Sequence, residues 1–183
     1  MTNLTIKNIT LCTLLILASP FLYAETNNIT AQLNIEVFDG LCVQNFDNYS
    51  TIDQMSNAFG GKEIPKDMQN ADPAMRQMGG KSFYFPYKGK KYIVGYTFGG
   101  GCSIASKNID AKNLSKLLIK NYNAILIDTQ PTGAQVNETY QIRNTTIHNG
   151  ALITLAYPRQ DTDYKEGSIG FISASTAKKM LVK

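Results

Sequence analysis

The chain has 183 residues, 43% of them hydrophobic, and a formal net charge of +4. A chain of this length and composition can bury one substantial core, so a single folded domain is expected. The mild excess of basic residues is spread along the chain. It does not form the dense basic face that a nucleic-acid-binding protein needs, so nucleic acid is not an expected partner.

The first 24 residues have the layout of a secretory signal peptide. Lys7 is their only charged residue, an apolar core runs from about Ile9 to Leu17, and a cleavage site is predicted after Ala24. The apolar core is too short for a membrane-spanning helix, which needs about 20 residues, and no longer apolar run follows. We therefore expect a signal peptide at 1–24 and a single periplasmic domain at 25–183. An uncleaved amphipathic or membrane anchor is the alternative.

Three cysteines are present, and Cys12 falls inside the predicted signal peptide. Cys42 and Cys102 remain in the mature chain, where an oxidising compartment favours pairing. We expect a Cys42–Cys102 disulfide that closes a loop of about 60 residues, with two buried free thiols as the alternative. Zinc is disfavoured because His148, the lone histidine, adds only a third ligand to the two thiols. No metal or cofactor is expected.

Apolar residues at helical spacing predict three helices, at 30–46, 49–59 and 111–123. Gly40, within the first, is interpreted as a point of close packing near Cys42. The segment 62–80 contains two prolines and a glycine pair and is expected to be irregular. Its methionines are expected to fill gaps in the core rather than to line a surface; they are Met68, Met75 and Met78.

The segment Lys81–Ser106 carries the strongest β-strand signal. Aromatic residues alternate with others on both sides of a predicted tight turn at Lys88-Gly89. Pro86 cannot donate to a strand ladder, so the first strand of this hairpin is expected at a sheet edge or at a bulge. A glycine corner at 99–101 then leads into a third strand at 102–106.

Three further strands are predicted at 135–143, 151–157 and 169–175, and a short apolar piece at 124–127 precedes them. Turns are predicted at 128–133, 149–150 and 166–167, from their glycine and polar residues. Strands and helices segregate in the sequence rather than alternate. The predicted fold class is therefore α+β, with an antiparallel sheet, about three helices and one disulfide.

Several motifs suggest chemistry but have a simpler interpretation. Gly79-Gly80-Lys81-Ser82 lacks the first glycine of a phosphate loop and precedes a strand. The glycine corner before Cys102 can form an anion nest, but it equally fits a bulge beside the disulfide. His148 lies in a polar turn where a solvated side chain is expected.

Two pairs of carboxylates are candidates for the acid and base of a glycosidase, namely Asp161 with Asp163 and Asp67 with Asp72. Both pairs lie in loop-like segments, where ordinary solvated acids are the simpler interpretation. We therefore expect no catalytic residues.

The strongest binding candidate is the predicted hairpin, where aromatic and basic residues interleave: Tyr84, Tyr87, Lys88, Lys90, Lys91 and Tyr92. Tyrosines and cations together can bind an acidic protein surface or stack on sugars. The alternative is an edge strand that its lysines protect from aggregation. The sequence does not separate these two interpretations.

The order of elements resembles a known group of proteins. Phe38 and Cys42 lie on an early helix, the aromatic hairpin runs into Gly101-Cys102-Ser103, and a helix and closing strands follow. This pattern resembles a family of small exported proteins and lipoproteins of Gram-negative bacteria, although no cysteine here suits lipid attachment. In size, export and one disulfide the chain also resembles periplasmic immunity proteins, which block toxins delivered into the envelope.

The expected function is a periplasmic, non-enzymatic module that binds a protein of the envelope. An immunity protein that neutralises a delivered toxin is the specific form of this hypothesis. One alternative is a cell-wall or glycan binder that uses the hairpin tyrosines. A second is an envelope hydrolase that uses His148 or a pair of loop carboxylates.

Overall fold

The computed structural model describes the backbone of residues 19–181 except residue 71, and side chains from residue 29 to residue 180. The predicted signal peptide, with Cys12, therefore lies mostly outside the described residues. Its predicted cleavage site after Ala24 falls within the first helix, α1 (Ser19–Phe38). Cleavage there would leave a helix that begins at Glu25.

The described residues form six α-helices, one π-helical turn and eight strands. The helical elements are α1, the π-helical turn η1 (Asp39–Val43), α2 (Tyr49–Ala58), α3 (Lys66–Gln69), α4 (Pro73–Met78), α5 (Ala111–Tyr122) and α6 (Ala174–Leu181). The strands are β1 (Lys62–Glu63), β2 (Gly80–Tyr87), β3 (Lys90–Thr97), β4 (Gly101–Lys107), β5 (Ala124–Thr132), β6 (Gln135–Ile142), β7 (Leu152–Pro158) and β8 (Glu166–Ile172).

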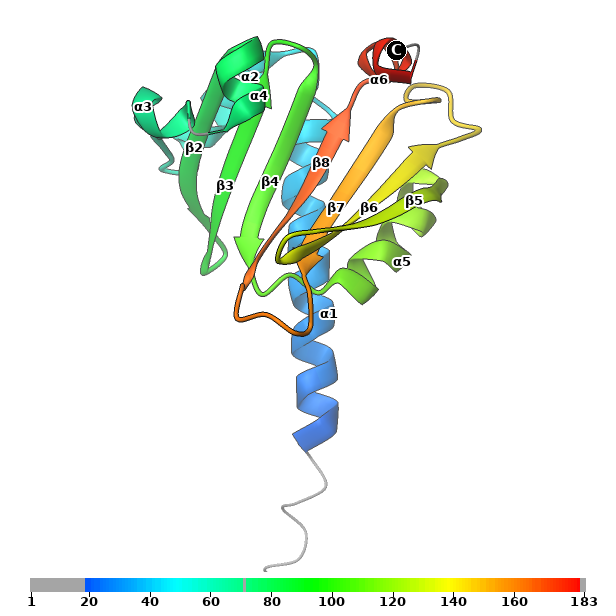
Figure 1. Ribbon diagram of the computed structural model, residues 1–183. Helices are drawn as coiled ribbons and strands as arrows, with labels where there is room; N and C mark the ends of the chain where they lie inside the picture. Colours follow the sequence, from blue (N-terminus) through cyan, green and yellow to red (C-terminus); the bar gives the residue numbers. More distant parts are fainter. Residues whose placement is uncertain (1–18, 71, 182–183) are drawn as a thin grey trace, which may run out of the picture.

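All eight strands form one antiparallel sheet in the order β1-β2-β3-β4-β8-β7-β6-β5 (Figure 1). The sheet is thus two four-stranded meanders that meet where β4 pairs with β8. The predicted α+β class, antiparallel sheet and disulfide are confirmed, but the sheet is larger and the helices are more numerous than expected.

The core lies between one face of the sheet and the helices α1, α2 and α5. In Figure 1 these helices lie behind the sheet, and α1 packs against α5 and β4. Aromatic side chains of β2 and β3 are buried there, as predicted from their alternation: Phe83, Phe85, Tyr92 and Tyr96. We call this side of the sheet the helical face and the opposite side the open face.

The disulfide joins the helices to the sheet. Cys42 in η1 and Cys102 in β4 are bonded, with their Cα atoms 5.3 Å apart and both residues buried. The π-helical turn at the end of α1 buries three consecutive residues, Leu41, Cys42 and Val43. Gly40 does not serve close packing, because a Cβ atom there would meet nothing within 4 Å.

The helical predictions were incomplete at both ends of the chain. The first helix begins at Ser19 rather than Thr30, since no helix-breaking residue interrupts 21–39. The segment 62–80 is not irregular, because it contains β1, α3 and α4. The predicted strand 169–175 ends at Ile172, and Ala174 begins α6.

Two predicted turns are strand instead. Residues 128–132 continue β5, where Pro131 is tolerated because β5 is an edge strand. Gly167 lies within β8, where a Cβ atom would stand 2.4 Å from Ile109 Cγ2. The glycine therefore serves close packing rather than a chain reversal.

Candidate functional site

The hairpin turn forms as predicted, but its tip is fastened to α1. Lys88 and Gly89 both have positive φ, 46° and 76°, as a two-residue type I′ turn requires. Tyr87 Oη donates to Glu36 Oε1 at 2.6 Å, and Lys88 Nζ donates to the same carboxylate at 2.8 Å. Hydrogen bonds from Lys88 and then Tyr87 lower the pKa of the Glu36 carboxyl below its usual value. These two side chains therefore already have an intramolecular partner.

The six candidate residues of the hairpin do not form one surface. Tyr92 is buried in the core, and Lys90 Nζ donates to Thr30 Oγ1 on α1 at 3.0 Å. Tyr84 and Lys91 are exposed and lie on the open face. Alternation along a strand places neighbours on opposite faces, so a contiguous run of aromatic and basic residues is divided between the two.

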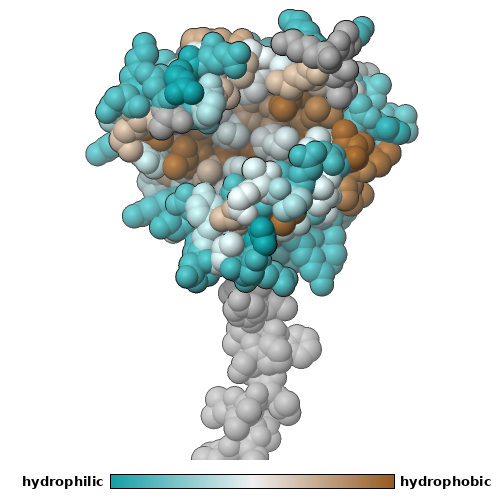
Figure 2. Space-filling view, in the orientation of Figure 1, coloured by the Kyte–Doolittle hydropathy of each residue, from teal (hydrophilic) through white to brown (hydrophobic). Residues whose placement is uncertain are grey.

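The open face carries small and apolar side chains over its central strands. The strand register aligns them in two adjacent rows. The first row contains Ser82, Gly95, Ser103, Gly170 and Thr154. The second row contains Tyr84, Ile93, Ala105, Ser168 and Ala156. No helix covers the second row among the described residues. Figure 2 shows this face, with apolar surface in a hollowed band between hydrophilic margins.

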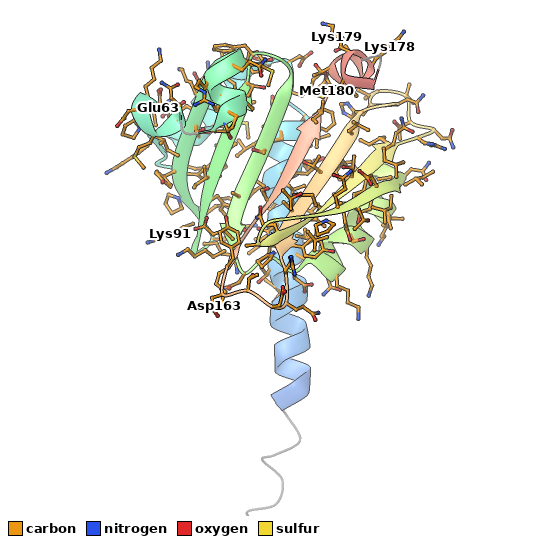
Figure 3. The ribbon with its side chains drawn as sticks, viewed as in Figure 1. Glu63, Lys91, Asp163, Lys178, Lys179 and Met180 are labelled. Carbon is orange, nitrogen blue, oxygen red and sulfur yellow. A yellow bond between two sulfur atoms is a disulfide. The ribbon has the colours of Figure 1, made fainter. Side chains whose placement is uncertain are left out.

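At its lower end in Figure 1, beside the hairpin, the open face forms a hollow of about 530 Å³. Tyr84 and Ile93 form its apolar lining, and Lys91 and Lys107 stand with Glu166 at its margin. The position of Lys91 near the β2–β3 turn is visible in Figure 3. This hollow thus combines an aromatic ring, an aliphatic floor and an excess of positive charge.

At its upper end, the open face forms a second hollow of about 230 Å³ between α4 and α6. Met75 and Met78 line it from α4, and Met180 lines it from α6 (Figure 3). Met78 and Met180 are 36% and 51% exposed, and Met68 on α3 is 54% exposed. Met68 and Met78 therefore lie at the surface rather than filling the core as predicted, whereas Met75 is half-buried. Unbranched, polarizable methionines are typical of surfaces that adapt to a binding partner.

The short helix α4 places Met75 and Met78 on the open face. Asp72 accepts hydrogen bonds from the backbone N–H groups of Ala74 and Met75, and Pro73 occupies the first turn. The helix lies on the open face against β3, where Gly95 leaves space for the Met75 side chain. An Asp-Pro pair before a short segment is a helix-start signal that the sequence interpretation missed.

The glycine-rich motifs have structural partners. Lys81 Nζ lies 2.7 Å from Asp53 Oδ2, and this hydrogen bond raises the pKa of the lysine. At the glycine corner, Thr176 Oγ1 donates to the carbonyl of Gly99 at 2.7 Å, and Ser173 N donates to that of Gly100. The corner therefore holds the start of α6.

Three of the remaining catalytic candidates, His148, Asp161 and Asp72, have structural contacts of their own. His148 is half-buried rather than fully solvated, because its ring packs edge-on against Phe46 and Phe171, with centroids 5.5 Å and 5.4 Å away. Asp161 pairs with Arg159 at 2.6 Å, which lowers the pKa of the aspartate. Asp72 caps α4, as described above.

No family model, no curated protein and no solved structure matches this chain. None of the helices in the described part of the chain is both long enough and apolar enough to cross a membrane. Across the same residues, no three His, Cys, Asp or Glu side chains gather in a way that could hold a metal ion.

Proposed function

We propose that this chain is an exported, non-enzymatic module that binds an envelope protein on the open face of its sheet. Neutralisation of a delivered toxin, as by a periplasmic immunity protein, is the specific role proposed. The supporting observation is the open face itself, where a row of small and apolar residues runs between exposed methionines and a basic margin. Exposed apolar surface with a polar rim is characteristic of protein interfaces.

The chemistry of the face indicates the kind of partner. Lys91 and Lys107 outnumber Glu166 at the lower hollow, so the matching surface of the partner is expected to be acidic there. The small floor residues allow close approach, so an apolar segment of the partner is expected between α4 and α6. A disulfide-stapled sheet changes shape little on binding, which reduces the entropic cost of association.

The test is capture of a partner from a periplasmic extract with the tagged mature chain. Ile93→Asp with Ala105→Asp places two carboxylates on the apolar floor, and Lys91→Glu reverses a charge at its margin. Both variants are expected to lose a partner that the wild-type chain retains in stoichiometric amount. Lys120→Glu, on the exposed side of α5, is the matched control and is expected to retain it.

Two outcomes would contradict the proposal. One is a lone monomer in every growth condition and with the products of neighbouring genes. The other is a partner that the Ile93/Ala105 variant retains as well as the wild type. Survival of cells that receive the toxin, with and without the same variants, then separates neutralisation from simple binding.

Glycan binding remains the second candidate because Tyr84 is 47% exposed on the open face. Tyr87 and Tyr92 are unsuitable for stacking on sugars, since Lys88 and Phe59 already contact the ring of the first and the second is buried. Retention on peptidoglycan that Tyr84→Ala abolishes would favour this function over the protein-binding one.

A further inference from the structure

A polar pocket lies on the helical face, on the other side of the sheet from the proposed protein-binding surface. The first turns of α5, the core-facing side of β6 and β7, and the loop at 159–165 line an open pocket of about 910 Å³. This volume lies within the range of pockets that hold small molecules. Neither the hairpin prediction nor the open face includes these residues.

Glu138 on β6 lies in this pocket as a carboxylate held by two phenols. Tyr157 Oη donates to Glu138 Oε1 at 2.9 Å, and Tyr140 Oη donates to Oε2. Ser115 Oγ on α5 lies 2.7 Å from Tyr140 Oη and donates to it, since the phenol gives its one proton to Glu138. The carboxylate thus has a fixed orientation, and burial with the bond to Glu138 raises the pKa of Tyr157 to about 12.

Glu138 has capacity for a further donor. A carboxylate offers about four lone-pair directions, and two are used here. It forms no ion pair with any cation in the described part of the chain. A half-buried carboxylate with donors but without a counter-ion is suited to bind an ammonium group.

The walls of the pocket carry the opposite charge. Lys112 and Lys116 stand one turn apart on α5, where residues at i and i+4 share a face. Lys165 and Arg159 line it from the loop. Arg159 is paired with Asp161, whereas the three lysines form no ion pair with the residues described. The pocket therefore has one inner anion and an excess of cations around it.

We propose that this pocket binds a small acidic zwitterion, a molecule with one primary amine and at least two acid groups. Glu138 accepts the ammonium, and the lysines of α5 and the loop bind the acid groups. Glu138 repels a simple anion, and the lysines repel a simple amine. Only a ligand with both kinds of charge satisfies both parts of the pocket, so an acidic amino acid or peptide end is the chemical class it fits.

The experiment measures binding to the mature chain by calorimetry and by NMR shifts. The probes are L-glutamate, glutarate, which lacks the amine, and 4-aminobutanoate, which lacks one acid. Glutamate is expected to bind most tightly. Glu138→Gln is expected to weaken glutamate about tenfold or more and to leave glutarate equal or tighter. Lys112→Gln with Lys116→Gln is expected to weaken both, and Lys120→Gln on the same helix neither.

Absence of saturable glutamate binding would overturn the proposal. So would a Glu138→Gln variant that keeps the wild-type preference for glutamate over glutarate. Each variant is first checked for the wild-type melting temperature. If Glu138→Gln does not fold, the Lys112/Lys116 variant decides, because its exposed side chains are outside the core: unchanged glutamate binding there refutes the site.

Discussion

Removal of the Cys42–Cys102 disulfide tests how the helical layer is held to the sheet. The bond closes a loop across 60 positions of sequence. The chain-entropy relation gives about 4 kcal/mol for a loop of this length, because the cross-link removes conformations from the unfolded chain. For a domain of roughly 150 residues, that loss corresponds to a fall in melting temperature of roughly 10–15 °C.

The assay is urea unfolding of the oxidised protein, the reduced protein and the Cys42→Ala/Cys102→Ala variant. The reduced protein keeps both sulfur atoms in the core, so it separates the loss of the cross-link from the loss of packing. Both forms without the bond are expected to lose about 4 kcal/mol. Their m-values are expected to rise, because an unfolded chain without the cross-link exposes more surface.

A loss below about 1 kcal/mol in both forms would refute the entropic reasoning. A large loss in the alanine variant alone would show that the buried sulfur atoms, rather than the closed loop, provide the stability. Mass spectrometry without reductant is the accompanying check, since the oxidised chain must lack the two thiol hydrogens.

Three further predictions follow from buried groups and backbone geometry. In the same urea assay, Tyr92→Phe is expected to be neutral or to stabilise the protein by up to about 1 kcal/mol, because the tyrosine hydroxyl is buried without a partner among the described residues. Tyr122→Phe should instead cost about 1.5 kcal/mol, because it removes the 2.9 Å hydrogen bond from Tyr122 to Asp39. Gly80→Ala should cost about 2–3 kcal/mol of stability, because φ is +146° and a Cβ atom would stand 2.0 Å from a backbone oxygen. Gly89→Ala, with φ +76° and open space around it, should cost about 1 kcal/mol. Equal losses of stability in the two variants would contradict this difference. Burial raises the pKa of Tyr92 from 10.0 to about 12, so its ionisation lowers the stability of the folded protein as pH rises from 10 to 12; this fall should be smaller in Tyr92→Phe, and an equal fall in both proteins would contradict the prediction.

The sequence predicted the parts of the fold that local pattern controls. The hairpin at Lys88-Gly89, the aromatic face of β2 and β3 and the helix predicted at 111–123 each depend on residues close together in the chain. The disulfide could be predicted because only two of the three cysteines lie outside the predicted signal peptide. These signals need no knowledge of what the other elements do.

The missed features depend on tertiary context. The polar residues 128–132 extend β5 because β6 supplies a ladder beside them. Tyr92 is buried and Tyr84 exposed because α1 covers only one face of the sheet. The pocket around Glu138 joins Lys116 of α5, Glu138 of β6 and Arg159 of the following loop, each more than twenty positions from the next, so no short motif marks it.

The meeting of the two meanders at β4 and β8 has a consequence for how the chain folds. Within each meander the strands pair with sequence neighbours, but this junction joins Ile104 to Ile169 across α5 and three strands. Local hairpins form quickly, whereas distant pairing must first close a long loop. We therefore expect joining of the halves to limit the folding rate. Until then, β4 and β8 present unpaired edges, which invite association between chains. Refolding yield should accordingly rise as the protein is diluted.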